Sequence, residues 1–211
     1  MQDGTPRKLS TMLEEDLKQL PDADISVAQI LELFHERGFG FFLFLFSLPM
    51  ALPIPVPPGI NIMFALPLLF LTFQQMIRRH SIWLPQFIIK RTIASSSLSG
   101  LILNNANPFI RKIEIIIKPR LGEITKGFSS SLIGLAGLIM ALAICIPIPL
   151  SNTIPSFGIA LMAIGVLMRD GIAVIIGMIV GLLWVIILSW ALIYFGNEGI
   201  DILKEWIKSW L

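Results

Sequence analysis

The stretch that decides the fold is Leu52-Pro53-Ile54-Pro55-Val56-Pro57-Pro58-Gly59, which lies inside residues 38–77, a block without any Lys, Arg, Asp, Glu or His. At a rise of ~1.5 Å per residue, this block would make a helix of about 60 Å, twice the ~30 Å hydrocarbon core of a bilayer. Prolines break helices because they lack the N–H donor, and Gly59 tolerates the backbone of a sharp turn. We therefore expect the block to fold back on itself at this run.

A second copy of the arrangement lies in residues 127–168, which also contain no Lys, Arg, Asp, Glu or His. This block is interrupted by Ile146-Pro147-Ile148-Pro149-Leu150-Ser151-Asn152-Thr153-Ile154-Pro155. Both runs share the pattern apolar-Pro-Ile-Pro-apolar. The sequence predicts an internal repeat of two membrane hairpins with proline-rich tips at 53–59 and 147–155.

Composition places the chain among membrane proteins. Hydrophobic residues make up 55% of the 211 residues, and they form continuous blocks rather than strand-like alternation. We therefore predict an all-α, polytopic integral membrane protein with interfacial amphipathic helices and one C-terminal spanning helix. The second arm of the second hairpin is short for a full crossing, so re-entrant and fully spanning hairpins are both open.

The chain divides into six segments. Their predicted roles, in chain order, are cytosolic or interfacial amphipathic helices (1–37), the first hairpin (38–77), a basic cytoplasmic region of interfacial helices (78–127), the second hairpin (128–168), a spanning helix (171–196) and an amphipathic tail (197–211). Ser26 and Gln29 have the spacing of a capping box at the start of a helix.

Charge predicts the orientation. Residues 78–126 hold nine of the sixteen Lys and Arg residues and only two acids. The positive-inside rule therefore places this region, the N-terminus and both ends of each hairpin in the cytoplasm. One alternative is open: if residues 92–103 crossed the membrane, the two hairpins would be inverted relative to each other, as in many transporters.

Catalytic and metal-binding patterns are missing from the sequence. The chain has two His and one Cys, and no motif for a nucleophile, phosphate loop or metal site occurs. We expect neither an enzyme nor a bound metal or cofactor, and no nucleic-acid partner. Asp170 is the only acid near membrane depth, and we expect it to cap a helix or pair with Arg169 rather than relay protons.

The broken helix ends are the candidate binding sites. The second arms begin just after the tips, where free backbone N–H groups and the helix dipole favour an anion. The alternative is that the polar side chains there only cap the broken backbone. The candidate substrate-binding residues are Pro53, Pro55, Pro58, Gly59, Asn61, Gln75, Pro147, Pro149, Asn152, Pro155, Arg169 and Asp170. A cytoplasmic basic surface is expected from Arg78, Arg79 and Arg120.

Small residues on the C-terminal spanning helix suggest a packing face. Gly177 and Gly181 form a G-x-x-x-G pattern, which lets a second helix approach closely. We expect this face to pack inside the chain, and a homo-oligomer is the alternative.

In combination these motifs are similar to one family. The matching residues are Arg37-Gly38-Phe39-Gly40, Leu52-Pro53-Ile54-Pro55, Pro58-Gly59, Pro67-Leu68-Leu69, Gln75, Trp83-Leu84-Pro85, Glu114, Lys118-Pro119-Arg120-Leu121, Pro147-Ile148-Pro149, Asn152, Pro155 and Arg169-Asp170-Gly171. They resemble the ExoD-type exopolysaccharide-synthesis proteins. The resemblance implies a bacterial inner-membrane protein that is linked to the production of an exported polysaccharide.

Two functional hypotheses follow. The first is a non-enzymatic transporter or flippase-like protein for an anionic or lipid-linked precursor, such as a polyprenyl-phosphate-linked sugar, acting in the lipid bilayer. The second is an assembly or regulatory scaffold that holds polysaccharide-synthesis proteins.

Overall fold

The structure, a computed structural model, describes residues 10–11, 15, 24–26, 29, 38–52, 59–79, 81–84, 86, 92–93, 111, 117–125, 127–146 and 151–208. Five helices dominate this part of the chain: α3 (Gly38–Ala51), α4 (Ile60–Met76), α8 (Gly127–Ile144), α9 (Thr153–Met168) and α10 (Gly171–Lys208). A short 3₁₀ helix, η3 (Gly122–Thr125), precedes α8. The described fold is therefore helical, apart from one two-residue antiparallel strand pair.

That strand pair joins β1 (Ile25–Ser26) to β2 (Thr92–Ile93). Residues 92–93 were expected to belong to interfacial helices, and this expectation is wrong for these two residues. Their extended backbone completes its hydrogen bonds with the N-terminal segment instead. The predicted capping box is confirmed: the Ser26 N–H donates to Gln29 Oε1 (2.8 Å) and the Gln29 N–H donates to Ser26 Oγ (3.3 Å). Most of segments 1–37 and 78–127 lies outside the described residues.

Helices α3 and α4 flank the first proline run, and α8 and α9 flank the second. α3 ends at Ala51, and α4 begins directly after Gly59, whose φ of 97° is a left-handed conformation that glycine adopts without strain. The tip residues 53–58 and 147–150 lie outside the described residues. The helix breaks therefore occur at the two proline runs, as the sequence indicates.

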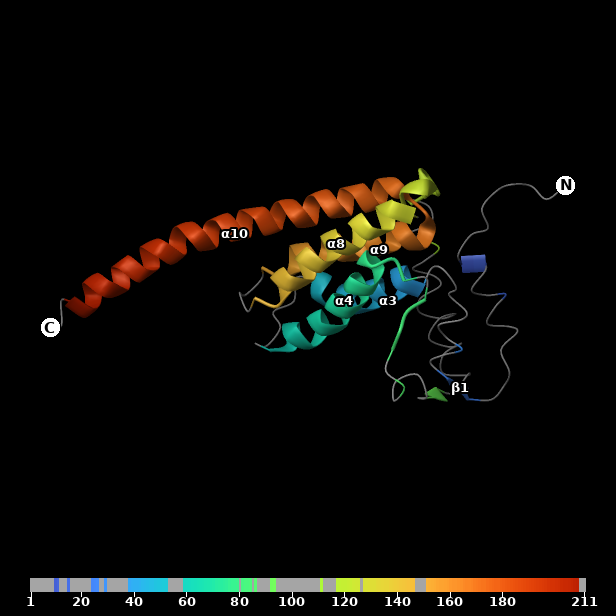
Figure 1. The fold of residues 1–211 in the computed structure, drawn as a ribbon, viewed down its shortest axis with the longest axis horizontal. Helices are drawn as coiled ribbons and strands as arrows, with labels where there is room; N and C mark the ends of the chain where they lie inside the picture. The colour runs from blue at the N-terminus through green and yellow to red at the C-terminus, as the bar shows by residue number, and fades with distance from the viewer. Residues whose placement is uncertain are drawn as a thin grey trace.

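The two hairpins pack against each other more closely than their own arms do. α3 lies along α9, and α4 lies along α8, while α10 covers α9 (Figure 1). The contact between α3 and α9 pairs the first arm of the first hairpin with the second arm of the second hairpin. The contact between α8 and α4 pairs the corresponding arms with the two hairpins exchanged. The repeat in the sequence is thus an approximate two-fold relation in the structure.

Two glycines at corresponding positions of the two hairpins make equivalent close contacts. Gly40 and Gly134 are separated by the same number of residues as Pro53 and Pro147. A Cβ atom added at Gly40 would lie 2.8 Å from the carbonyl O of Ala163 and 3.0 Å from the backbone N of Leu167. A Cβ atom at Gly134 would collide with the backbone N of Met76. Each first arm therefore touches the last turn of the other hairpin's second arm.

These contacts set the direction of the repeat. The starts of α3 and α8 and the ends of α4 and α9 all lie together at one end of the bundle, which we call the base end. The opposite end, with the starts of α4 and α9, is the tip end. Both hairpins open toward the base end (Figure 1). The repeat is therefore parallel, and the inverted arrangement is wrong for the described helices.

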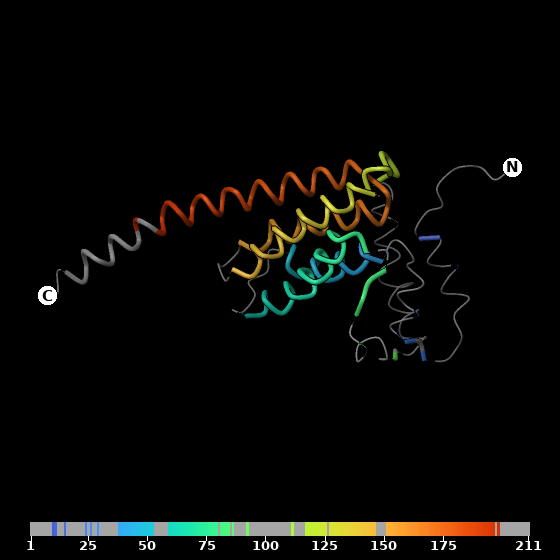
Figure 2. The backbone as a smooth tube through the Cα atoms, viewed as in Figure 1, coloured from blue at the N-terminus to red at the C-terminus, as the bar shows by residue number. Residues whose placement is uncertain are grey.

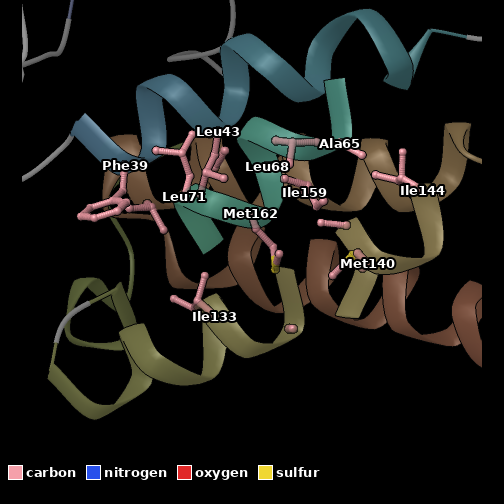
Figure 3. Close-up of a cluster of buried hydrophobic side chains, with 14 of the residues drawn as sticks. Phe39, Leu43, Ala65, Leu68, Leu71, Ile133, Met140, Ile144, Ile159 and Met162 are labelled. Atoms are coloured by element: carbon pink, nitrogen blue, oxygen red, sulfur yellow. The ribbon is translucent and has the colours of Figure 1, made fainter. Parts of the chain in front are cut away.

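The core lies where the four arms meet. Leu68, Met140, Ile144 and Ile159 are almost completely buried, and Figure 3 shows side chains from α3, α4, α8 and α9 pointing into this region. Lipid tails are as apolar as leucine, so the hydrophobic effect adds little to helix association inside a bilayer. Close packing and small residues must supply the stability of such a bundle.

α10 also packs through small residues. A Cβ atom at Gly177 would lie 2.7 Å from the carbonyl O of Gly158 in α9, and a Cβ atom at Gly181 would collide with the sulfur of Met140 in α8. The expectation that the G-x-x-x-G face packs inside the chain is confirmed. The helix continues without a break to Lys208, and its coloured part already extends past the other helices (Figure 2). The boundary expected at 196/197 is therefore not a helix end.

Two of the described helices are long and apolar enough to cross a membrane: residues Gly127–Ile144 of α8 and Gly171–Gly196 of α10. Only 28% of the α10 window is buried inside the protein, which sets it apart from the core helix of a soluble domain. The other apolar helices, α3, α4 and α9, are shorter. Together these features indicate a membrane protein.

Substituting Gly134 tests the contact between the hairpins. We expect Gly134→Ala to lower the unfolding temperature in detergent, because the new methyl group meets the fixed backbone of α4; overpacking of this kind costs about 1–3 kcal/mol. The matched control is Gly196→Ala in α10, where an added Cβ meets nothing within 4 Å. That change should leave stability equal or slightly higher, because alanine favours helix. Equal effects of the two substitutions would contradict the close approach.

Candidate functional site

The candidate residues from the sequence separate into two groups at opposite ends of the bundle. Gly59, Asn61, Asn152 and Pro155 lie at the tip end. Gln75, Arg169, Asp170, Arg78, Arg79 and Arg120 lie at the base end. Asn61 and Gln75 belong to the same helix, and fourteen residues of helix separate them by about 21 Å. Of the candidate substrate-binding residues, Gln75, Arg169 and Asp170 therefore lie away from the tips, at the same end as the expected basic surface. Pro53, Pro55, Pro58, Pro147 and Pro149 lie outside the described residues.

At the tip end, Asn61 connects the two hairpins. Its side chain is buried, its Oδ1 accepts a hydrogen bond from the Gly59 N–H (3.1 Å), and its Nδ2 donates to the carbonyl O of Ile144 (3.1 Å). Ile144 is the last residue of α8, where carbonyl groups lack helical partners. Asn61 thus satisfies backbone groups of both hairpins. This is the capping role rather than the ligand-binding role.

The start of α9 is less completely satisfied. Asn152 precedes the helix, but its side chain makes no capping hydrogen bond to the first turn. Its Oδ1 instead accepts a hydrogen bond from Ser151 Oγ (3.3 Å). α4 likewise begins without a side-chain cap. Among the described residues, neither second arm therefore has a side-chain cap at its start.

Ser156 is a residue that sequence reasoning missed. It lies in the first turn of α9, is fully buried, and its Oγ has no hydrogen-bond partner. Leaving a buried hydroxyl unpaired costs about 1–3 kcal/mol. A sequence signal existed, because a serine directly after Pro155 in an uncharged helix start is a polar group that needs a partner. Its hydroxyl lies in the first turn of a helix whose start lacks a side-chain cap.

Trp184 was also missed. Its Nε1–H donates to the carbonyl O of Ser151 (3.0 Å), which ties the second tip to the middle of α10. Tryptophan in membrane helices usually marks the interface. The position of Trp184, well inside the uncharged part of α10, was the available signal for a specific partner.

At the base end, the two second arms finish in the same way. Arg78 and Arg169 adopt left-handed conformations, with φ values of 59° and 56°. The Arg79 N–H donates to the Gln74 O and the Asp170 N–H donates to the Gly165 O, which are the long bonds of a Schellman motif. Glycine is usual at this position. Each arm therefore keeps an arginine where the backbone would favour glycine.

Asp170 begins α10. It is buried, and its Oδ1 accepts hydrogen bonds from the N–H groups of Ile172 (2.9 Å) and Ala173 (3.3 Å). A carboxylate at this position satisfies two backbone donors and opposes the positive end of the helix dipole. The expectation that Asp170 caps a helix is confirmed.

Two adjacent glutamines at the end of α4 have different roles. Gln74 holds the chain after the helix: its Oε1 accepts from the Trp83 N–H (2.7 Å) and its Nε2 donates to the Trp83 O (3.1 Å). Gln75, the residue expected to bind substrate, is buried, and its Oε1 has no hydrogen-bond partner. It lies at the base end and is not part of the tip cluster.

Basic side chains gather around η3 at the base end. Arg78 and Arg79 follow α4 and are exposed, and Lys118 and Arg120 precede η3 and are also exposed. The Gly171 N–H donates to the carbonyl O of Arg120 (2.7 Å), which joins this segment to the start of α10. We call Arg78, Arg79, Lys118, Arg120 and Arg169 the basic cluster. Its chemistry suits phosphate, which guanidinium groups bind through paired hydrogen bonds.

The two ends have different chemical capacities. Within the described parts of the hairpins, the tip end offers two helix starts with their dipoles and the unpaired hydroxyl of Ser156, and 38–77 and 127–168 contribute no charged side chain. The base end offers fixed positive charge. Among the residues that the structure describes, no three His, Cys, Asp or Glu side chains lie close enough to hold a metal ion.

Comparisons with known proteins identify the family to which the chain is similar. The sequence profile described as "Exopolysaccharide synthesis, ExoD" matches residues 9–190. The chain is 33% identical over 188 residues to the uncharacterized protein slr1875 of Synechocystis sp., covering 87% of this chain and 88% of that protein. It is 30% identical over 122 residues to the protein ExoD of Rhizobium meliloti, covering 56% of this chain and half of that protein. No solved structure matches the chain.

Two substitutions of Asp170 test its role as a cap. We expect Asp170→Asn to keep the unfolding temperature close to that of the wild type, because the amide oxygen can accept the same two hydrogen bonds. Asp170→Ala should destabilise the protein by about 1 kcal/mol through loss of the cap. Thermal unfolding in detergent measures both. If Asp170→Asn were as damaging as Asp170→Ala, the carboxylate would have a role beyond capping.

Proposed function

The chain belongs to the ExoD family of exopolysaccharide-synthesis proteins, and from this premise we propose that it moves an anionic, lipid-linked precursor across the bacterial inner membrane. Family membership implies involvement in exopolysaccharide synthesis. The movement of a lipid-linked precursor, such as a polyprenyl phosphate carrying a sugar, is our proposal. In it the protein is not an enzyme, and its work is to bind a head group and lower the barrier to crossing.

The observation that carries the proposal is the unsatisfied start of α9. The helix begins without a side-chain cap, and the buried, unpaired hydroxyl of Ser156 lies in its first turn. A phosphate accepts hydrogen bonds from such a helix end without any positive side chain. Asn152 lies at the same point and can donate through its amide. The head group would thus exchange hydrogen bonds with water for hydrogen bonds with the tip.

The basic cluster serves as the entry point. Opposite charges attract a phosphate head group toward the base end before it reaches the tips. In this orientation the N-terminus and the base end face the cytoplasm, and both hairpins enter and leave the bilayer on that face. They are then re-entrant hairpins whose tips lie inside the membrane. Unpaired backbone groups at such a depth require protein or water partners, which the Asn61 and Trp184 hydrogen bonds supply in part.

Ser156 gives a sharp test of the tip site. The assay places the purified protein in liposomes with a fluorescent polyprenyl phosphate and measures the rate at which the label becomes accessible from the other leaflet. We expect Ser156→Ala to slow this movement severalfold, because one of the donors to the phosphate is removed. The same change should leave the unfolding temperature equal or higher, since it removes a buried unpaired hydroxyl.

Ser47→Ala is the matched control. Ser47 is equally buried, but its Oγ already donates to the carbonyl O of Phe44 (3.2 Å), so this variant should transport like the wild type. Equal rates for Ser156→Ala and the wild type would remove Ser156 from the site. If the wild-type protein does not accelerate any of several anionic lipids, the transport proposal fails and the assembly role is favoured.

Glycine substitutions test the basic cluster separately from the fold. We expect Arg78→Gly to be as stable as the wild type or more stable by about 1 kcal/mol, because glycine adopts the left-handed conformation without strain. Arg78→Gly and Arg169→Gly should both slow transport at low salt, and the difference from the wild type should shrink as salt screens the charges. Unchanged transport at low salt would exclude attraction by these arginines.

A further inference from the structure

The length of α10 indicates how deep the helix bundle reaches into a membrane. Residues from Gly171 to Phe195 carry no charge and make about 36 Å of helix, enough to cross a ~30 Å hydrocarbon core with some tilt. The start of this stretch lies at the base end, directly after Arg169 and Asp170. The other end carries Trp190 and Tyr194, whose rings stack at 5.5 Å. Paired aromatic side chains of this kind are typical of the membrane interface.

The second tip meets α10 near the middle of this stretch. The hydrogen bond from Trp184 to Ser151 lies thirteen residues after Gly171, which is about 20 Å of the ~36 Å. Because this hydrogen bond marks a position along the helix axis, the fraction of the membrane depth at which it lies does not change if α10 is tilted. If α10 crosses the bilayer, the second tip lies close to its middle.

The first tip lies at the same level. The hydrogen bond from Asn61 Nδ2 to Ile144 O joins the start of α4 to the end of α8, directly before the second tip. Both hairpins also share the base end. All four arms therefore lie alongside the part of the stretch between Gly171 and the level of Trp184.

Beyond the tips α10 has no described partner along its exposed face. The large exposed side chains there include Leu183, Ile186, Ile187, Trp190, Ile193, Tyr194 and Phe195. Close helix–helix contacts in membranes favour small residues, and the G-x-x-x-G face of α10 is already occupied by α8 and α9. Most of these side chains are large and apolar, and they fit fluid acyl chains better than a second helix; Trp190 lies toward the far interface, where its indole N–H can reach water.

We infer that the four arms fill only the leaflet at the base end, and that α10 alone crosses the other leaflet, where acyl chains cover its face from Leu183 to Phe195. This inference rests on the proposed membrane function and deepens it by naming the lipid as the partner of this surface. A lipid head group bound at the tips has then crossed half of the bilayer in contact with the protein. The remaining distance is about 15 Å, the length of helix from Val185 to Phe195.

Spin labels measure the depth directly. Labels are attached to single cysteines placed in the variant Cys145→Ser, since Cys145 is the one cysteine of the chain. Met63→Cys and Ile146→Cys probe the two tips, and both positions are exposed. Arg79→Cys and Phe195→Cys are the controls for the two surfaces. In liposomes, the relative access of oxygen and of a water-soluble nickel chelate reports the depth of each label.

The tip labels should be the deepest, close to the bilayer centre, with the Arg79→Cys and Phe195→Cys labels at opposite head-group levels. Tip labels at the level of Phe195→Cys would show fully spanning hairpins and overturn the inference. A label at Ile193→Cys should meet oxygen freely and show no spin–spin broadening; broadening would place a second copy on this face and also overturn it. These depths are read without any transport, so a failure of the transport assay leaves them interpretable.

Discussion

The structure depends on the need of backbone N–H and C=O groups for hydrogen-bond partners where water is scarce. A helix that stops inside an apolar environment exposes such groups at its end, and lipid offers them nothing. At the two tips, side chains supply some of the missing partners: Asn61 serves Gly59 and Ile144, and Trp184 serves Ser151. At the base end the arms close on themselves in Schellman motifs. The start of α9 has no side-chain cap, and the Ser156 hydroxyl in its first turn has no partner.

The second requirement is close packing without help from the hydrophobic effect. The hairpins exchange contacts across the repeat, first arm against second arm, and glycines at the contact points let the backbones touch. Such an arrangement makes each hairpin depend on the other more than on its own two arms. It also explains why a repeat is useful: the same contact, built twice, holds both tips at one end of the bundle.

Function follows from the separation of the two ends. Among the described residues, Arg78, Arg79, Arg120 and Arg169 lie at the base end, and the uncapped start of α9 with Ser156 lies about 20 Å away along the helices. A charged side chain at the tips would be costly inside a membrane. Backbone donors and a serine hydroxyl avoid that cost and still offer hydrogen bonds to a phosphate. In the proposed function the two ends act in sequence, first by attraction and then by hydrogen bonding.

The sequence by itself determined the helical class, the two hairpins, their breaks at the proline runs and the ExoD family, because uncharged blocks and prolines act locally along the chain. Asp170 as a cap was predictable for the same reason. Only the tertiary structure decided that the repeat is parallel, that the candidate residues form two groups and that Ser156 and Trp184 belong with the tip. The reason is that these facts depend on which helices lie side by side. Asn61 and Ile144 are eighty-three residues apart in sequence, and no local pattern announces their hydrogen bond.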